Sequence, residues 1–93
     1  MAPKTVARFV AKEFGLDPDE LATRSYAART AKKVALEMYC RYTQKSQRTI
    51  GAHFGYHGNG SVMKQRQRLR GLLADDRGVQ RRCNRIEKAL ASA

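Results

Sequence analysis

The sequence predicts an all-α protein: a compact domain of five to six helices in which a helix-turn-helix lies around a long central helix. Apolar residues recur at helical spacing in each long segment of the chain. Glycines and helix-capping residues separate those segments. With 93 residues and 42% hydrophobic content, the chain can bury one modest core. We therefore expect a single domain over residues 1–93.

The first expected helix covers Thr5–Phe14 and ends at Gly15, a residue suited to the C′ position. A short second helix follows, to about residue 23. Asp17 is a good N-cap for it, Pro18 a good first residue, and Glu20 gives a pattern like a capping box. The basic segment 23–25 then forms a loop.

The central helix is expected over Tyr26–Tyr42, which is the longest periodic run. Lys32 and Lys33 lie off its apolar stripe, where they are either solvated or in contact with phosphates; Arg41 is less suited to such contact. Tyr39 and Tyr42 are better explained as core residues than as stacking platforms for single strands. The apolar stripe consists of Ala27, Ala31, Val34, Ala35, Met38 and Tyr42.

The helix-turn-helix is predicted at about 46–73. Ser46 can cap its first helix, in which Ile50 and Phe54 share a face. Glycines at 55, 58 and 60 then favour a sharp turn. Gly58 or Asn59 is the expected cap of the second helix. The apolar side of that helix carries Val62, Leu69, Leu72 and Leu73, and its charge comes from Lys64, Arg66, Arg68 and Arg70.

A last helix is predicted at about 78–91, with Asp75 or Asp76 as its cap. We expect its basic residues to be solvated. The spacing of its apolar residues predicts that Val79, Cys83, Ile86 and Leu90 face the core.

Charge indicates the class of partner. The net charge is +11, and every charged residue between Arg24 and Arg70 is basic except Glu37. Crowded cations repel one another, so such a surface is best explained by a polyanion, above all nucleic acid. A membrane surface fits less well, because the apolar residues of the basic helices form core stripes and the chain has no Trp.

The sequence predicts neither catalysis nor a cofactor or metal. Cys40 and Cys83 stand alone, which favours buried thiols in a reducing compartment. His53 and His57 are four residues apart, but Gly55 interrupts the helix that would align them. The chain has no secretory leader and no membrane span, so we expect it in the cytoplasm, associated with the nucleoid.

The segment IGAHFGYHGNGSV (50–62) resembles the C-terminal DNA-binding domain, domain IV, of the bacterial replication initiator DnaA. VAKEFGLDPDELATRS (10–25) and ARTAKKVALEM (28–38) are similar to the preceding helices of that domain. The resemblance implies a fold of the DnaA domain IV and Trp-repressor type. Where DnaA has Gly-Arg-Asp-His-Thr-Thr, this chain has residues 56–61, and only Ser61 is of a similar type, which argues against origin-box recognition.

A closer resemblance is to the DnaA-like C-terminal domain of transposases of the repetitive-palindrome-associated tyrosine class. Those domains also lose the Arg-Asp-His and continue through a Leu-Leu-x-x-Asp segment into a final basic helix, as residues 72–90 do here. The resemblance implies the DNA-binding part of a transposase-related protein, with the catalytic domain missing.

The expected function is therefore double-stranded DNA binding, with sequence preference. Two alternatives stay open: a domain that binds structured RNA or hairpins, and a basic module that meets an acidic protein. The residues predicted to contact DNA are Arg24, Lys32, Lys45, Ser46, Arg48, His57, Asn59, Gly60, Ser61, Lys64, Gln65 and Arg68.

Overall fold

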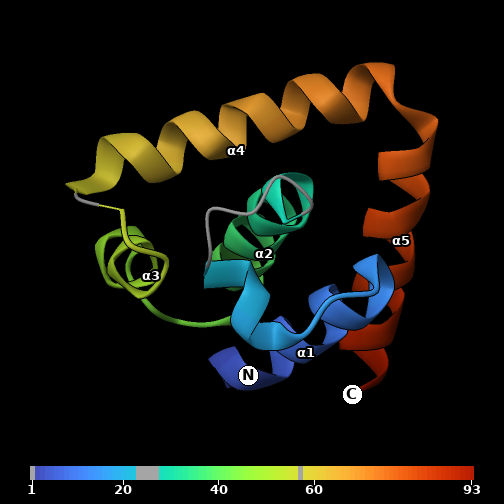
Figure 1. Ribbon diagram of the computed structural model, residues 1–93, viewed down its shortest axis with the longest axis horizontal. Coiled ribbons are helices and arrows are strands. Elements are labelled where there is room, and N and C mark those ends of the chain that lie inside the picture. The colour runs from blue at the N-terminus through green and yellow to red at the C-terminus, as the bar shows by residue number, and fades with distance from the viewer. Residues whose placement is uncertain (1, 23–27, 57) are drawn as a thin grey trace.

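A computed structural model describes residues 2–22, 28–56 and 58–93. All regular secondary structure in these residues is helical, which confirms the predicted all-α class (Figure 1). There are five α-helices and one short 3-10 helix. They are α1 (Pro3–Phe14), η1 (Pro18–Ala22), α2 (Arg29–Tyr42), α3 (Gln47–His53), α4 (Gly58–Asp75) and α5 (Arg77–Ser92).

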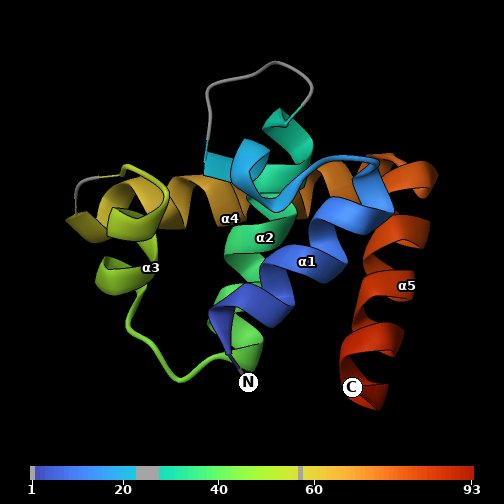
Figure 2. The same cartoon turned by 60° about the horizontal axis from the view of Figure 1, so that its bottom comes forward.

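Helix α2 lies at the centre, as predicted, and packs against α1, η1, α3 and α4 (Figures 1 and 2). Burial extends around most of its circumference rather than along one stripe, because neighbours approach it from several sides. It is not the longest helix: α2 has 14 residues and α4 has 18. The predicted start at Tyr26 lies outside the described residues.

The first two elements begin and end where their local chemistry requires. Pro3 occupies the first turn of α1, two residues before the predicted start. Gly15 ends the helix in the left-handed region at φ 68°, a conformation that suits glycine. The backbone N–H of Asp17 donates to Glu20 Oε1 at 3.2 Å, but the turn that follows is a 3-10 helix, not an α-helix.

Helices α3 and α4 are joined by a short turn around Gly55, which has φ 81°. The Ser46 hydroxyl accepts a hydrogen bond from the backbone N–H of Thr49 at 3.1 Å, so this residue caps α3 as predicted. Helix α4 begins at Gly58, which places Gly58 and Asn59 inside its first turn and corrects their assignment as the cap. Phe54 is buried beneath the turn.

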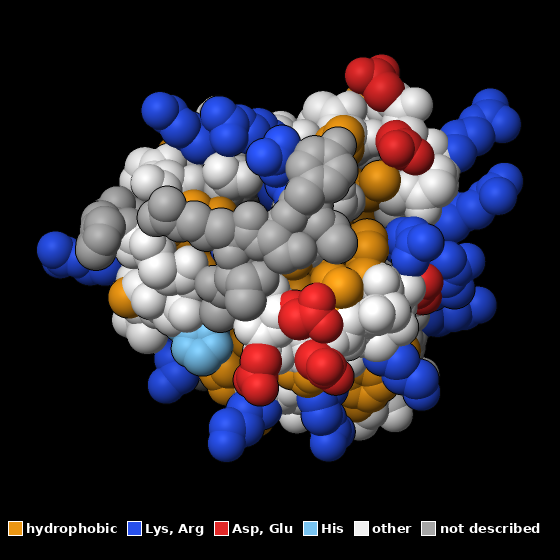
Figure 3. All heavy atoms as spheres, in the orientation of Figure 1, with side chains coloured by type: hydrophobic (Ala, Val, Ile, Leu, Met, Phe, Trp, Pro, Cys, Tyr) orange, Lys and Arg blue, Asp and Glu red, His pale blue; other side chains and the backbone are white. Residues whose placement is uncertain are grey.

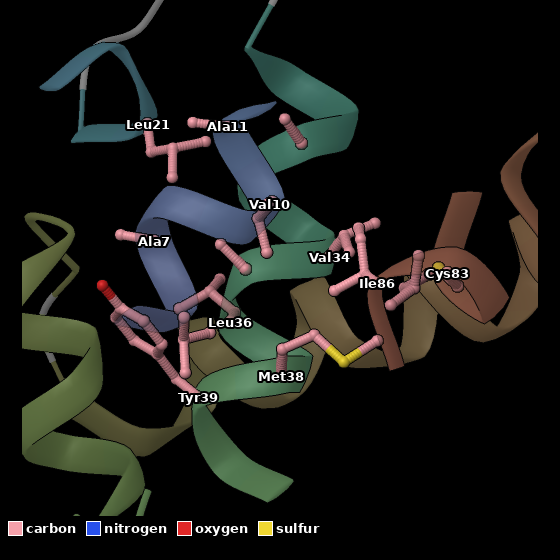
Figure 4. Packing of buried hydrophobic residues seen from close by; sticks show 14 of the residues in the cluster. Ala7, Val10, Ala11, Leu21, Val34, Leu36, Met38, Tyr39, Cys83 and Ile86 are labelled. Atoms are coloured by element: carbon pink, nitrogen blue, oxygen red, sulfur yellow. The ribbon is translucent and has the colours of Figure 1, made fainter. Parts of the chain in front are cut away.

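The core joins α1, α2 and α5 (Figure 4). Asp76 caps α5 by accepting from the Val79 N–H at 3.2 Å. All four residues predicted on its buried face are buried, and Cys83 lies among them, whereas Cys40 is half-buried. Across residues 2–22, 28–56 and 58–93, no helix has the length and apolarity needed to cross a membrane.

Ion pairs connect helices that are distant in the sequence. The buried Glu37 carboxylate of α2 accepts from Arg66 Nε of α4 and from Arg41 Nε, each at 2.8 Å. Arg41 also pairs with Glu87 of α5. Glu13 of α1 likewise pairs with Arg82 and Arg85 of α5. Arg82 and Arg85 were expected to be solvated; Arg85 is exposed and Arg82 is partly exposed, but both also pair with Glu13, while Arg66 is tied to the interior.

Removing the Glu37 charge should destabilise the fold. In Glu37→Gln, Arg66 loses its carboxylate partner and Arg41 keeps only Glu87. Breaking a fully buried pair costs about 3–5 kcal/mol, and we expect about 2–3 kcal/mol here because both arginines are partly exposed. Urea unfolding at neutral pH measures the loss. Asp19→Asn, on an exposed aspartate, is the control and should change stability by less than about 0.5 kcal/mol.

The same pair predicts an acid-sensitive contribution to stability. Burial raises the pKa of Glu37, but the hydrogen bonds from Arg66 and Arg41 outweigh it and leave the pKa below its ordinary value of 4.5. A carboxylate with a lowered pKa stabilises the folded state above its unfolded pKa, and this is lost as the pH falls through the folded value. Below pH 4.5, wild-type stability should therefore fall more steeply than that of Glu37→Gln. Parallel curves would contradict this assignment.

Candidate nucleic-acid interface

Helix α4 has one buried side and one exposed side. Val62 and Leu69 are buried and Leu72 is partly buried, as predicted. Lys64 and Arg68 lie one turn apart and are exposed. Met63 is 51% exposed, so it does not fill the core. The exposed side of α4 is therefore free to meet a partner and carries cationic groups.

Four basic residues come together where the first half of α2 meets α4. We call Arg29, Lys32, Lys33 and Arg68 the α2–α4 basic cluster. Lys33 is only 9% exposed, and its Nζ donates to the Arg29 carbonyl at 3.4 Å. Lys32 is half-buried, with its Nζ 5.7 Å from the centroid of the Tyr56 ring. Arg68 approaches from α4 and lines the same cavity as Arg29 and Lys33.

The surroundings of Lys33 within the α2–α4 basic cluster disfavour its charged form. Burial lowers the pKa of Lys33, and the positive charges of Arg29, Arg68 and Lys32 lower it further. Burial raises the pKa of the neighbouring Tyr56 hydroxyl, while Arg68 opposes that shift. No carboxylate contributes to the lowered pKa of Lys33. The folded chain thus holds a nearly buried ammonium group among like charges.

A cavity of about 420 Å³ opens beside the cluster. Three cationic side chains line it, together with the Thr30 side chain and one acidic residue, Asp75. A phosphate group could accept hydrogen bonds from the guanidinium groups and offset the repulsion among the cations. The lining residues are Arg29, Thr30, Lys33, Arg68, Gly71, Leu72 and Asp75.

Four other arginines form ion pairs with acidic residues of the fold. Arg41, Arg66, Arg82 and Arg85 pair with Glu37, Glu87 or Glu13. Figure 3 shows Lys and Arg side chains at the upper left, over α4, and also along the right and lower edges. Acidic side chains lie below the centre and at the upper right of the same view.

The structure brings only some of the predicted contact residues together. Lys32 and Arg68 belong to the basic cluster, and Lys64 is exposed on the same helix as Arg68. Ser46 caps α3, and Lys45 lines a different, apolar cavity. Arg24 and His57 lie outside the described residues. Of the others, Arg48 and Gly60 are exposed, Ser61 and Gln65 are half-buried, and Asn59 lies in the first turn of α4.

Two residues of the cluster were missing from the predicted contact set. The predicted set did not include Arg29, and the sequence left Lys33 between solvation and phosphate contact. The available signal was their i, i+4 spacing, which puts both on one face of α2. That face meets Arg68 only because α4 packs against α2. This packing is a contact between distant segments, so the local sequence does not predict it.

Comparison with known proteins does not identify the site. No protein-family model matches the chain, and no curated protein matches it. Among the described residues, no group of three or more His, Cys, Asp or Glu side chains could hold a metal ion. The functional argument therefore depends on the geometry and charge of the cluster itself.

Replacing the buried lysine should stabilise the protein. In Lys33→Met the apolar stem is kept and the repelled charge is removed, so we expect a gain of about 0.5–1 kcal/mol, as is typical when a strained functional group is relieved. Urea unfolding at neutral pH measures the gain. Lys88→Met, on an exposed lysine of α5, is the matched control and should change stability little. A loss of stability in Lys33→Met would contradict the electrostatic assignment.

The pH dependence provides a second check on Lys33. Because its pKa lies below the ordinary 10.5 when the chain is folded, the folded state binds fewer protons than the unfolded state just below that pH. Wild-type stability should gain from this group as the pH rises through its folded pKa toward 10.5. The advantage of Lys33→Met over wild type should shrink over the same range.

Proposed function

We propose that this protein binds double-stranded DNA, with α3, the turn at Gly55 and α4 acting as a helix-turn-helix. In this proposal the exposed side of α4 faces the major groove, and the α2–α4 basic cluster holds a backbone phosphate. The single observation that carries the proposal is the nearly buried Lys33, whose pKa is lowered by burial and by three neighbouring cations. The chain acts as a binding protein and not as an enzyme.

The energetic argument favours a polyanion over simple solvation. A solvated lysine keeps its ammonium in water, whereas Lys33 is 9% exposed and has a lowered pKa. Holding a charge this way costs stability unless a counter-charge arrives. A DNA phosphate supplies that counter-charge and several hydrogen-bond acceptors. Binding of a phosphate then offsets the desolvation and repulsion of the Lys33 ammonium, which remain uncompensated in the unbound folded chain.

The exposed side of α4 offers groups that could contact bases. Lys64 and Arg68 can donate to guanine, and Gln65 can pair with adenine. The resemblance to DnaA domain IV supports this orientation of the unit. Because residues 56–61 differ from the DnaA turn, we propose a preferred sequence other than the origin box, in a transposase-related setting.

The proposal predicts which charges set the salt dependence of binding. Arg68→Ala should weaken binding to a duplex about tenfold, and should reduce the slope of log K against log salt concentration by about 1, because one phosphate contact is lost. Fluorescence anisotropy on a labelled duplex, over a range of salt concentrations, measures both. Arg81→Ala removes the same charge from an exposed position on α5 and is the matched control.

Two sets of results would contradict the proposal. Equal losses in Arg68→Ala and Arg81→Ala would mean that net charge, and not the cluster, drives binding. A hairpin or structured RNA that outcompetes every linear duplex would favour the alternative ligand. Selection from random duplexes with the purified chain then tests sequence preference. No enrichment of any sequence, together with weak binding, would favour a basic module that meets an acidic protein.

A further inference from the structure

A second cavity differs from the basic one in chemistry. It has a volume of about 430 Å³ and lies where the start of α1, the end of α2 and helix α3 meet. Volumes of this size are common for small-molecule sites, which are mostly apolar with a few polar groups. The lining residues are Ala2, Pro3, Lys4, Tyr39, Lys45, Thr49, Ile50 and His53. The walls are largely apolar, including the buried Ile50 and the Tyr39 ring.

The Tyr39 hydroxyl is a polar group in this cavity that lacks a partner. Tyr39 is only 2% exposed, and burial raises its pKa. Its ring packs against His53 and Phe54, with ring centroids 6.0 and 5.1 Å apart. Its hydroxyl forms no hydrogen bond with any part of the chain that the structure describes. In Figure 4 the hydroxyl oxygen lies at the end of the ring away from Met38. The hydroxyl oxygen is not among the fully buried atoms that lack a partner, so it keeps contact with solvent and is open to an acceptor on a ligand.

The charged residues around the cavity indicate the charge of the ligand that it would bind. Lys4 and Lys45 both line the cavity and are exposed, and neither forms an ion pair within residues 2–22, 28–56 and 58–93. Among the described residues that line the cavity, none is acidic. The two ammonium groups therefore favour a negatively charged ligand, while the walls favour an apolar one.

We propose that this cavity binds a small apolar carboxylate. The hydrocarbon part would lie against Ile50 and the Tyr39 ring. The carboxylate would accept a hydrogen bond from the Tyr39 hydroxyl and face the ammonium groups of Lys4 and Lys45. The site is separate from the α2–α4 basic cluster, and the inference does not depend on DNA binding. A second copy of the chain, or a neighbouring protein segment, is the competing occupant that the experiment must exclude.

The test is a titration of the full chain with octanoate, followed by amide chemical shifts in NMR spectra. Octanoate should bind with roughly millimolar affinity, as befits a ligand of its size. The shifts should concentrate at residues 2–4, 45, 49–50 and 53. Octylammonium, which has the same hydrocarbon chain but the opposite charge, should bind at least about tenfold more weakly. Acetate, which lacks the apolar chain, should not bind in the same range.

Tyr39→Phe isolates the hydroxyl without removing the ring. Because this hydroxyl forms no hydrogen bond within the part of the chain that the structure describes, the variant should fold as stably as wild type and bind octanoate about fivefold more weakly. Tyr42→Phe, at a half-buried tyrosine on the same helix, is the matched control and should bind like wild type. The proposal is overturned if Tyr39→Phe binds octanoate normally, if octylammonium binds equally well, or if sedimentation shows a dimer whose formation shields these same residues.

Discussion

The buried carboxylate of Glu37 is the contact on which the arrangement of helices most depends. It lies on the central helix and accepts hydrogen bonds from Arg66 of α4 and from Arg41, which reaches Glu87 of α5. Apolar packing alone holds helices together but constrains their rotation loosely, because many volume-conserving arrangements are close in energy. A charged pair with fixed geometry does not tolerate such rotation. The Arg66–Glu37 pair therefore sets which side of α4 faces inward.

That rotation decides where the other cations of α4 lie. Lys64 and Arg68 flank Arg66 by two residues on either side, so each points about half a turn away from it. With Arg66 turned toward Glu37, Lys64 is left exposed and Arg68 lies over the first half of α2. The internal ion pair thus positions the unpaired charges. This is also why the arginines of this chain cannot be treated as one basic surface.

Sequence reasoning succeeded where a local pattern determines the outcome. Helical periodicity and caps identified the end of α1 at Gly15, the Ser46 cap and the buried face of α5. It failed where the outcome depends on contacts between distant segments. The partners of Arg82 and Arg85 lie on α1, and the face shared by Arg29 and Lys33 matters only because α4 crosses it.

The start of α4 shows a local failure of a different kind. Gly58 and Asn59 were predicted to cap the helix, since glycine and asparagine favour helix ends. The helix begins at Gly58 instead, because the turn is completed earlier, by Gly55 with its positive φ. The backbone N–H of Tyr56 bonds to the Gly51 carbonyl at 2.8 Å, which closes the turn before the later glycines are reached. Several glycines close together therefore predict that a turn exists better than they predict where it ends.

Lys33 and Glu37 show how the fold leaves charge available for a partner. They are four residues apart on α2, the spacing at which opposite charges commonly pair along a helix, although lysine before glutamate is the weaker order. They do not pair here, since Arg66 and Arg41 occupy the Glu37 carboxylate. The only acid in the basic stretch is thus used for structure. Lys33 is left with a pKa lowered by burial and by the cations beside it, and in the proposed function a phosphate of the ligand offsets their repulsion.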